Sequence, residues 1–170
     1  MDAILNRRSV REYESSKKVD YEILLKLCKA AEAAPTARNQ RSREYIIIDD
    51  EDVIEKLSNI SQGARVLKNC NTVIAVIGKN KEEISTPHMQ DQDLACAVEN
   101  ILIEATYLGL GSCYIGVHPL EDRVMACNEI LGITGGAFTF ALITIGYPKE
   151  KDVFYDKKKF QDDLVHHNRY

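Results

Sequence analysis

The sequence contains no tryptophan, only 4 prolines and only 7% aromatic residues. It also has no apolar run that approaches the length of a membrane-spanning helix. The first arginine is already Arg7, which leaves no room before it for the apolar region of a signal peptide. We therefore expect a soluble, cytoplasmic protein that does not enter a membrane.

Paired cysteine motifs are missing as well. The 5 cysteines are widely spaced and include no C-x-x-C pair, the spacing of many zinc and dithiol redox sites. This pattern predicts reduced thiols, with neither a disulfide nor a metal site. Two of them, Cys28 and Cys96, fall among apolar residues in helical patterns, where a free cysteine behaves as a small hydrophobic side chain.

The sequence lacks the usual loops for nucleotides and the usual catalytic groupings. Gly109-x-Gly111 has neither the third glycine nor the preceding strand of a Rossmann fingerprint, and no Walker motif is present. The sequence shows no Ser-His-Asp or Cys-His pattern of the kind that marks a nucleophilic catalytic site. We interpret Asp91 and Asp93 as negative charge at the start of a helix. If the protein is an enzyme, a cofactor must carry its chemistry.

Length and charge narrow the function classes further. The 170 residues fit one domain with a single sizeable core. The formal net charge of -4 argues against nucleic acid as the main partner, because such proteins present a positive face.

The most informative feature present is the run Arg7-Arg8-Ser9-Val10-Arg11. A guanidinium matches phosphate oxygens two at a time, and the Ser9 hydroxyl can donate a further hydrogen bond. On their own these residues form either a local site for a phosphate or a solvated basic surface.

Hydrophobic periodicity predicts interleaved helices and strands. Capping residues and apolar spacing favour helices over residues 2–6, 20–34, 52–60, 91–108 and 120–131. Apolar runs favour strands over residues 45–48, 72–77, 112–116 and 138–145, the second of them buried on both faces. An α+β or α/β sandwich follows from this order.

Three segments remain open to two interpretations each. Residues 79–90 form either a loop that can include a turn of helix or a mobile lid. The apolar stripe of the 91–108 helix faces either the core or a second subunit. The charged C-terminal segment 149–170 contains scattered aromatic and apolar residues, so it is either disordered or extended across another surface.

Two further stretches suit the close approach of a flat ligand. Residues 34–40 combine small side chains with amides directly after a helix, and residues 111–117 place glycines around a strand. Each stretch is by itself equally compatible with an ordinary turn.

Taken in order, four motifs resemble the short form of the nitroreductase family of FMN-dependent oxidoreductases. They are Arg-Arg-Ser-Val-Arg, Ala-Pro-Thr-Ala-Arg-Asn, Gly-Leu-Gly-Ser-Cys-Tyr-Ile-Gly and Gly-Tyr-Pro. The resemblance spans nearly the whole chain and implies one α+β domain over residues 1–170, with a central, mainly antiparallel sheet flanked by helices. It also implies an intertwined homodimer in which residues 149–170 wrap the partner subunit.

The resemblance assigns FMN-binding roles residue by residue. Arg7, Arg8, Ser9 and Arg11 match the motif for the phosphate, ribityl chain and pyrimidine edge, which Gln62 also approaches. The family's strip that approaches the same flavin from the second subunit corresponds here to Pro35, Thr36, Ala37 and Asn39. The segment along the isoalloxazine matches Tyr114, Ile115, Gly116 and Val117, and a basic pair near the phosphate matches Lys157 and Lys159.

The implied activity is ping-pong hydride transfer from NAD(P)H through flavin N5 to a small acceptor such as a nitroaromatic, a quinone or a free flavin. No side chain is then needed as acid or base. A flavin-binding sensor or storage protein without turnover is the alternative. Two departures bear on the choice, since Ser42-Arg43 replaces the family's usual Pro-Trp and the 78–93 region is short.

Overall fold

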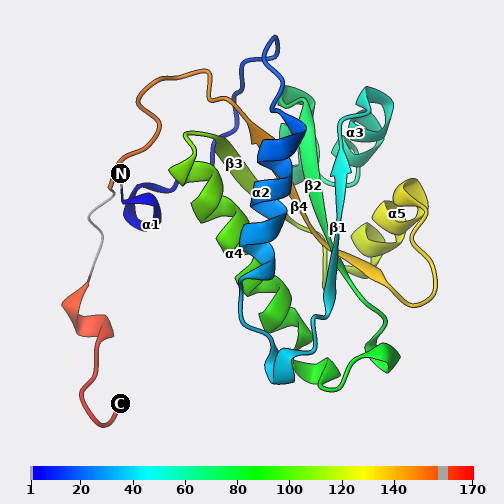
Figure 1. The fold of residues 1–170 in the computed structure, drawn as a ribbon, viewed down its shortest axis with the longest axis vertical. Helices are drawn as coiled ribbons and strands as arrows, with labels where there is room; N and C mark the ends of the chain where they lie inside the picture. Colours follow the sequence, from blue (N-terminus) through cyan, green and yellow to red (C-terminus); the bar gives the residue numbers. More distant parts are fainter. Residues whose placement is uncertain (1, 157–160) are drawn as a thin grey trace.

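Four strands form one sheet at the centre of the molecule, in the order β1-β2-β4-β3 (Figure 1). The computed structural model describes residues 2–156 and 161–170. The strands are β1 (Arg43–Ile48), β2 (Thr72–Gly78), β3 (Gly111–Gly116) and β4 (Phe138–Gly146). All pairings in this sheet are antiparallel, so the fold is α+β.

Helices cover both faces of the sheet (Figure 1). They are α1 (Ala3–Asn6), α2 (Tyr21–Glu32), α3 (Glu51–Ser58), α4 (Gln90–Tyr107) and α5 (Glu121–Leu131). The layer formed by α2 and α4 packs on one face, and α3 and α5 pack on the other. No helix in the described residues is long and apolar enough to cross a membrane. The predicted cytoplasmic location stays a prediction.

The two central strands are buried along their whole length. Successive side chains of a strand point to opposite faces, so β2 contributes to both layers of core. Ile74 and Val76 pack beneath α2 and α4, whereas Val73 and Ala75 face α3 and α5. The predicted burial of this strand on both faces is confirmed. The apolar stripe of α4 is also buried and belongs to the core.

Several boundaries differ from the predicted ones. The helix predicted from residue 52 begins at Glu51, because the Asp50 carboxylate caps it by accepting from the backbone N–H groups of Asp52 and Val53. A 3-10 helix, η2 (Gly63–Asn69), was not predicted. Residues 79–90 contain two short 3-10 turns, η3 (Lys81–Glu83) and η4 (Pro87–Met89).

Tyr13 fastens the N-terminal segment to the sheet. Its buried hydroxyl donates to the carbonyl oxygen of Val10 and lies 2.6 Å from the hydroxyl oxygen of Thr144. Its ring lies so close to Gly111 and Gly146 that added Cβ atoms would stand 3.1 and 2.8 Å from ring carbons. These two glycines therefore make room for the side chain that fixes the position of residues 7–11.

Replacing Gly146 by alanine should lower the free energy of unfolding by about 1–3 kcal/mol, because the new methyl group would push against the Tyr13 ring. Gly63→Ala is the matched control, since its nearest neighbour is 4.0 Å away, and we expect a change within about 0.5 kcal/mol. Urea unfolding measures both. Equal stability of the two variants would contradict the described packing.

Candidate functional site

A cavity of about 480 Å³ lies between the N-terminal segment and the segment that follows β4. Its lining comprises Arg7, Arg8, Ser9, Val10, Arg11, Glu12, Glu150, Asp152, Val153 and Tyr155. The whole arginine motif predicted to bind an anion therefore lies on one wall. The cavity is open to solvent, since Arg7 and Arg8 are half-buried and Ser9 and Arg11 are exposed.

Main-chain contacts hold this wall against the edge strand β3. Ser9 forms a parallel bridge with Ser112, and the Val10 N–H donates to the Ser112 carbonyl oxygen at 2.9 Å. From the η2 side, the Asn69 amide donates to the Arg11 carbonyl oxygen at 3.0 Å. Because the backbone is anchored on both sides, the arginine side chains start from fixed positions.

Arg8 is the least satisfied side chain of the cavity. Its Nη1 donates to the carbonyl oxygens of Leu5 and Arg7, and its guanidinium lies 4.5 Å from the centroid of the Tyr155 ring. Its Nε and Nη2 atoms are buried and have no hydrogen-bond partner among residues 2–156 and 161–170. A buried donor left unpaired costs about 1–3 kcal/mol, so these atoms point to an anionic ligand.

The neighbouring arginines have partners of their own. Arg7 Nε lies 3.2 Å from a carboxylate oxygen of Glu99 on α4, and Arg11 Nη1 donates to the Ser9 carbonyl oxygen at 3.2 Å. Carboxylates of Glu12, Glu150 and Asp152 line the same cavity. Arginines thus line one wall of the cavity, and carboxylates line other parts of it. This separation of opposite charges favours one orientation of a bound phosphate ligand.

The end of β3 presents accessible backbone. Tyr114 is 39% exposed and Gly116 is half-buried, with its carbonyl oxygen accepting from Arg123 Nη1 at 3.1 Å. Burial, and secondarily the charge of Asp91, raises the pKa of the Tyr114 phenol. The same Asp91 carboxylate lies 3.2 Å from Nε2 of His118. The first turn of α4 therefore lies beside the exposed end of β3.

The second predicted strip has an unusual backbone. Its short 3-10 turn, η1 (Ala37–Asn39), lies in a loop where Arg38, Asn39 and Arg41 adopt φ angles of 50°, 53° and 47°. Left-handed conformations of residues other than glycine cost on the order of 1–3 kcal/mol each and persist only where the surroundings enforce them. Something outside the loop must hold this shape.

Asp93, on the first turn of α4, supplies that support. The side chain is 5% exposed, and its two oxygens accept from Ala37 N at 2.9 Å, Gln40 Nε2 at 2.7 Å and Ser42 Oγ at 3.1 Å. Our interpretation of Asp93 as simple helix charge was therefore incomplete. Only the fold shows that a helix lies across from this loop.

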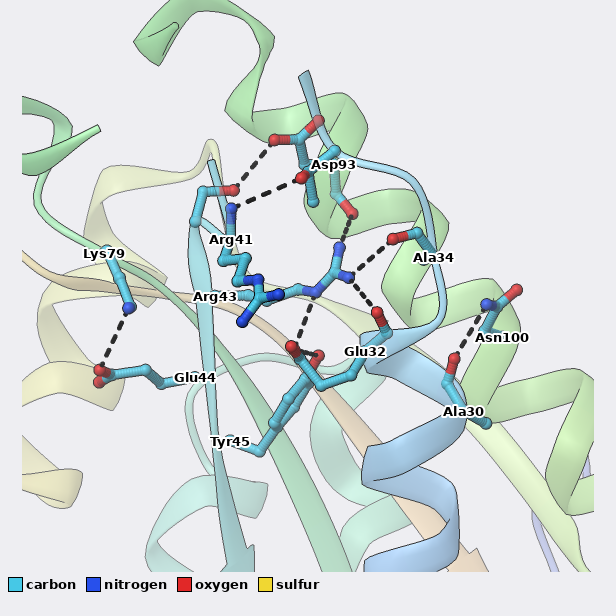
Figure 2. Close-up of polar contacts among 12 residues, drawn as sticks. Ala30, Glu32, Ala34, Arg41, Arg43, Glu44, Tyr45, Lys79, Asp93 and Asn100 are labelled. Atoms are coloured by element: carbon cyan, nitrogen blue, oxygen red, sulfur yellow. Dashed lines mark hydrogen bonds and ion pairs between the residues drawn. The ribbon is translucent and has the colours of Figure 1, made fainter. Parts of the chain in front are cut away.

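Arg43 holds the other end of the loop (Figure 2). Its buried guanidinium donates to the Glu32 carboxylate at 3.1 Å and to the carbonyl oxygens of Glu32 at 3.1 Å, Ala34 at 2.8 Å and Asp93 at 3.4 Å. These bonds satisfy carbonyl groups left unpaired where α2 ends. The Ser42-Arg43 pair that departs from the family pattern is thus a buried polar anchor.

The predicted site residues fall into separate groups. Along β3 and just beyond it lie Tyr114, Ile115, Gly116 and Val117, on the same edge strand that carries the arginine wall. At the first turn of α4, held by Asp93 and apart from the cavity lining, lies the strip of Pro35, Thr36, Ala37 and Asn39. Gln62 is exposed at the start of η2 and is not among the described cavity-lining residues. Lys157 and Lys159 lie outside the described residues.

The thiols take no part in these groups. All 5 cysteines are free. Burial raises the pKa of Cys70 and Cys127 to about 12, which keeps both thiols protonated at neutral pH. Cys96 is exposed on α4, unlike the apolar environment expected from its helical pattern.

Comparison with known proteins assigns the chain to a family. The model of the Nitroreductase family matches residues 4–66 and 61–147. The chain belongs to the nitroreductase family. A protein of Archaeoglobus fulgidus, provisionally named NADH dehydrogenase/NAD(P)H nitroreductase, is 34% identical over 168 residues, which cover 98% of this chain and 96% of the relative.

Solved structures agree with the fold over its whole length. A Clostridium acetobutylicum protein provisionally named NADH oxidase has a TM-score of 0.94 and 38% identity, covering 99% of this chain and 100% of that one. An FMN-dependent nitroreductase of Clostridium difficile has a TM-score of 0.90 and 30% identity, covering 99% of each chain. Nitroreductase-family structures therefore share this sheet order and these helix layers.

Acid should weaken the loop anchor through Glu32. Partial burial raises the pKa of this carboxyl, but hydrogen bonds from Tyr45 and Arg43 and the charge of Arg43 outweigh it and bring the pKa below its ordinary 4.5. A lowered folded-state pKa contributes stability above pH 4.5 that is lost as the pH falls through the folded value.

We therefore expect Glu32→Gln to lose less unfolding free energy than the parent between about pH 5 and about pH 3. Urea unfolding at a series of pH values measures the difference. Tyr45→Phe, which removes one of the two hydrogen bonds, should fall between them. Parallel curves for parent and Glu32→Gln would show that the ion pair contributes nothing to acid sensitivity.

Proposed function

We propose that this chain is an NAD(P)H-dependent flavin oxidoreductase that holds FMN at the arginine cavity. The observation that carries the proposal is the pair of buried, unpartnered Arg8 nitrogens beside Arg7 and Arg11, in a chain of the nitroreductase family. The names of its relatives support the same cofactors, since one is called FMN-dependent and another carries NAD(P)H in its name.

The donor set fits a flavin mononucleotide. Arg7, Arg8 and Arg11, with the Ser9 hydroxyl, would bind the phosphate and the ribityl chain, and Lys157 and Lys159 would add charge there. Residues 114–117 would lie along the ring, because β3 leads from the arginine wall to that exposed backbone. Gln62 would approach the pyrimidine edge.

The site is completed by a second copy of the chain in this proposal. Within one chain Asp93 holds the 35–39 strip at the first turn of α4, whereas Arg7 pairs with Glu99 further along that helix, and no residue of the strip lines the arginine cavity. On the surface near α1, Ile4 and Leu5 are 68% and 53% exposed. Such adjoining apolar side chains are typical of a subunit interface.

The C-terminal segment supports the same arrangement. Residues 161–170 lie away from the sheet and its helices (Figure 1), and Leu164 and Val165 are 68% and 64% exposed. An extended segment with exposed apolar residues gains free energy by burial on another subunit. We infer that it wraps the partner.

When bound, FMN would supply the redox chemistry between NAD(P)H and a small acceptor such as a nitroaromatic, a quinone or a flavin. The chain's own residues bind the cofactor, orient it and set the charge around it. No side chain is assigned as an acid or base. The exposed Tyr114 would border the open side where donor and acceptor enter.

The purified protein should show the absorption spectrum of an oxidised flavin. Addition of NADH or NADPH without oxygen should bleach it, and a quinone such as menadione or a nitroaromatic should restore it. Stopped-flow absorbance follows both half-reactions, and light scattering gives the mass of the flavin-bound species.

Three results would contradict parts of this proposal. Protein that stays colourless after incubation with FMN would remove the cofactor assignment. Bound flavin inert to both nicotinamides and both acceptors would indicate the sensor or storage role instead. A fully flavin-loaded monomer would exclude a site shared between two chains.

The arginine assignment is tested by comparing FMN with riboflavin, which lacks the phosphate. Arg8→Met keeps the aliphatic stem near Tyr155 and should weaken FMN binding by about 10- to 100-fold, because a hydrogen bond to a charged group contributes about 1.5–3 kcal/mol. Riboflavin affinity should stay at the parental value. Arg65→Ala, an exposed arginine on η2, is the control. Equal loss for both flavins would place the phosphate elsewhere.

A further inference from the structure

Asp93 makes contacts that a helix-capping charge would not need. Its Oδ1 accepts from Ala37 N, and its Oδ2 accepts from Gln40 Nε2 and Ser42 Oγ. Three donors are thus divided between its two oxygens, so both oxygens act as acceptors. These three partners bracket the left-handed residues of the loop.

Gln40 extends the contact to a second segment. Besides donating to Asp93, its amide accepts from the Thr86 N–H at 2.8 Å and donates to the Thr86 carbonyl oxygen at 3.3 Å. Thr86 belongs to the 79–90 segment that links β2 to α4. The 36–41 strip is therefore hydrogen-bonded both to α4, through Asp93, and to the 79–90 segment, through Thr86.

We propose that Asp93 and Gln40 are positioning residues that hold the 36–41 strip in the shape in which it meets the flavin. The inference rests on the proposed function, because the strip's part in flavin binding belongs to that proposal. It goes beyond it in naming two residues outside the predicted binding set. The left-handed residues Arg38, Asn39 and Arg41 would relax to other conformations without these bonds.

Donor and acceptor matching makes the pair testable. Asp93→Asn would turn one acceptor oxygen into an NH₂ donor that faces either Ala37 N or Gln40 Nε2. Rotating the Gln40 amide, so that its oxygen and nitrogen change places, would restore the contact with residue 93. It would also set the Gln40 NH₂ group against the Thr86 N–H, so one mismatch would remain. Gln40→Glu alone would set two carboxylates against each other. Together, D93N and Q40E again pair a donor with an acceptor between the two side chains and retain the bond from Thr86 N, whereas the donation to the Thr86 carbonyl oxygen and the acceptor for Ser42 Oγ are lost.

The experiment measures dissociation constants of FMN and riboflavin for the full-length parent and variants, below the onset of unfolding. We expect D93N and Q40E each to weaken both flavins by about tenfold and by the same factor, since the phosphate contacts are untouched. The D93N/Q40E double variant should lose less affinity than either single variant, because the bond between the two side chains is restored.

Asp50→Ala is the control for a purely structural loss. It removes the cap of α3 on the opposite face of the sheet, so it should lower the melting temperature and leave both flavin affinities unchanged. If D93N and Q40E also lower the melting temperature and leave both flavin affinities unchanged, the positioning role is wrong. Loss of affinity without rescue in the double variant would also overturn the pairing.

The same series separates this inference from the proposed function. A parent that binds no flavin overturns both. A parent that binds and reduces normally, with parental affinities in D93N and Q40E, overturns only the positioning role.

Discussion

Burial of the Arg43 guanidinium is the constraint on which the region between α2, α4 and β1 depends. A buried cation is tolerated only when its donors are matched, and here a carboxylate and three carbonyl oxygens from two helices and the loop after α2 provide the match. All of these acceptors must be in place at the same time. The contacts of Arg43 therefore fix the end of α2, the start of α4 and the first residue of β1 relative to one another.

Helix α4 transmits this arrangement to the rest of the proposed site. Its buried face is fixed by the core, and three of its acidic residues reach different segments: Asp93 the 36–41 strip, Glu99 the Arg7 guanidinium, and Asp91 the His118 ring. A shift of the helix in the core would move all three contacts together. Core packing and the geometry of the proposed site are in this way coupled by one rigid element.

The apolar core and the proposed binding site lie in different parts of the molecule. The sheet centre is apolar and buried on both faces, whereas the arginine cavity and the exposed end of β3 lie at its edge. Local costs occur in both parts of the proposed site: the unpaired Arg8 nitrogens at the cavity, and the left-handed residues of the strip held by Asp93. Such local costs are typical of binding sites, where the surrounding fold holds a conformation that a ligand needs.

Local sequence determined the elements and much of the candidate site. Periodicity and caps are short-range signals, so the helices and strands were predicted within a few residues, and the Arg7–Arg11 spacing indicated a phosphate site as one of two interpretations. The roles of Asp93, Gln40 and Arg43 were decided only by tertiary structure, because their partners are as much as 56 residues away and are defined only once α4 lies against the loop. Unpaired donors on Arg8 likewise arise from burial, which no neighbouring residue in the sequence reveals.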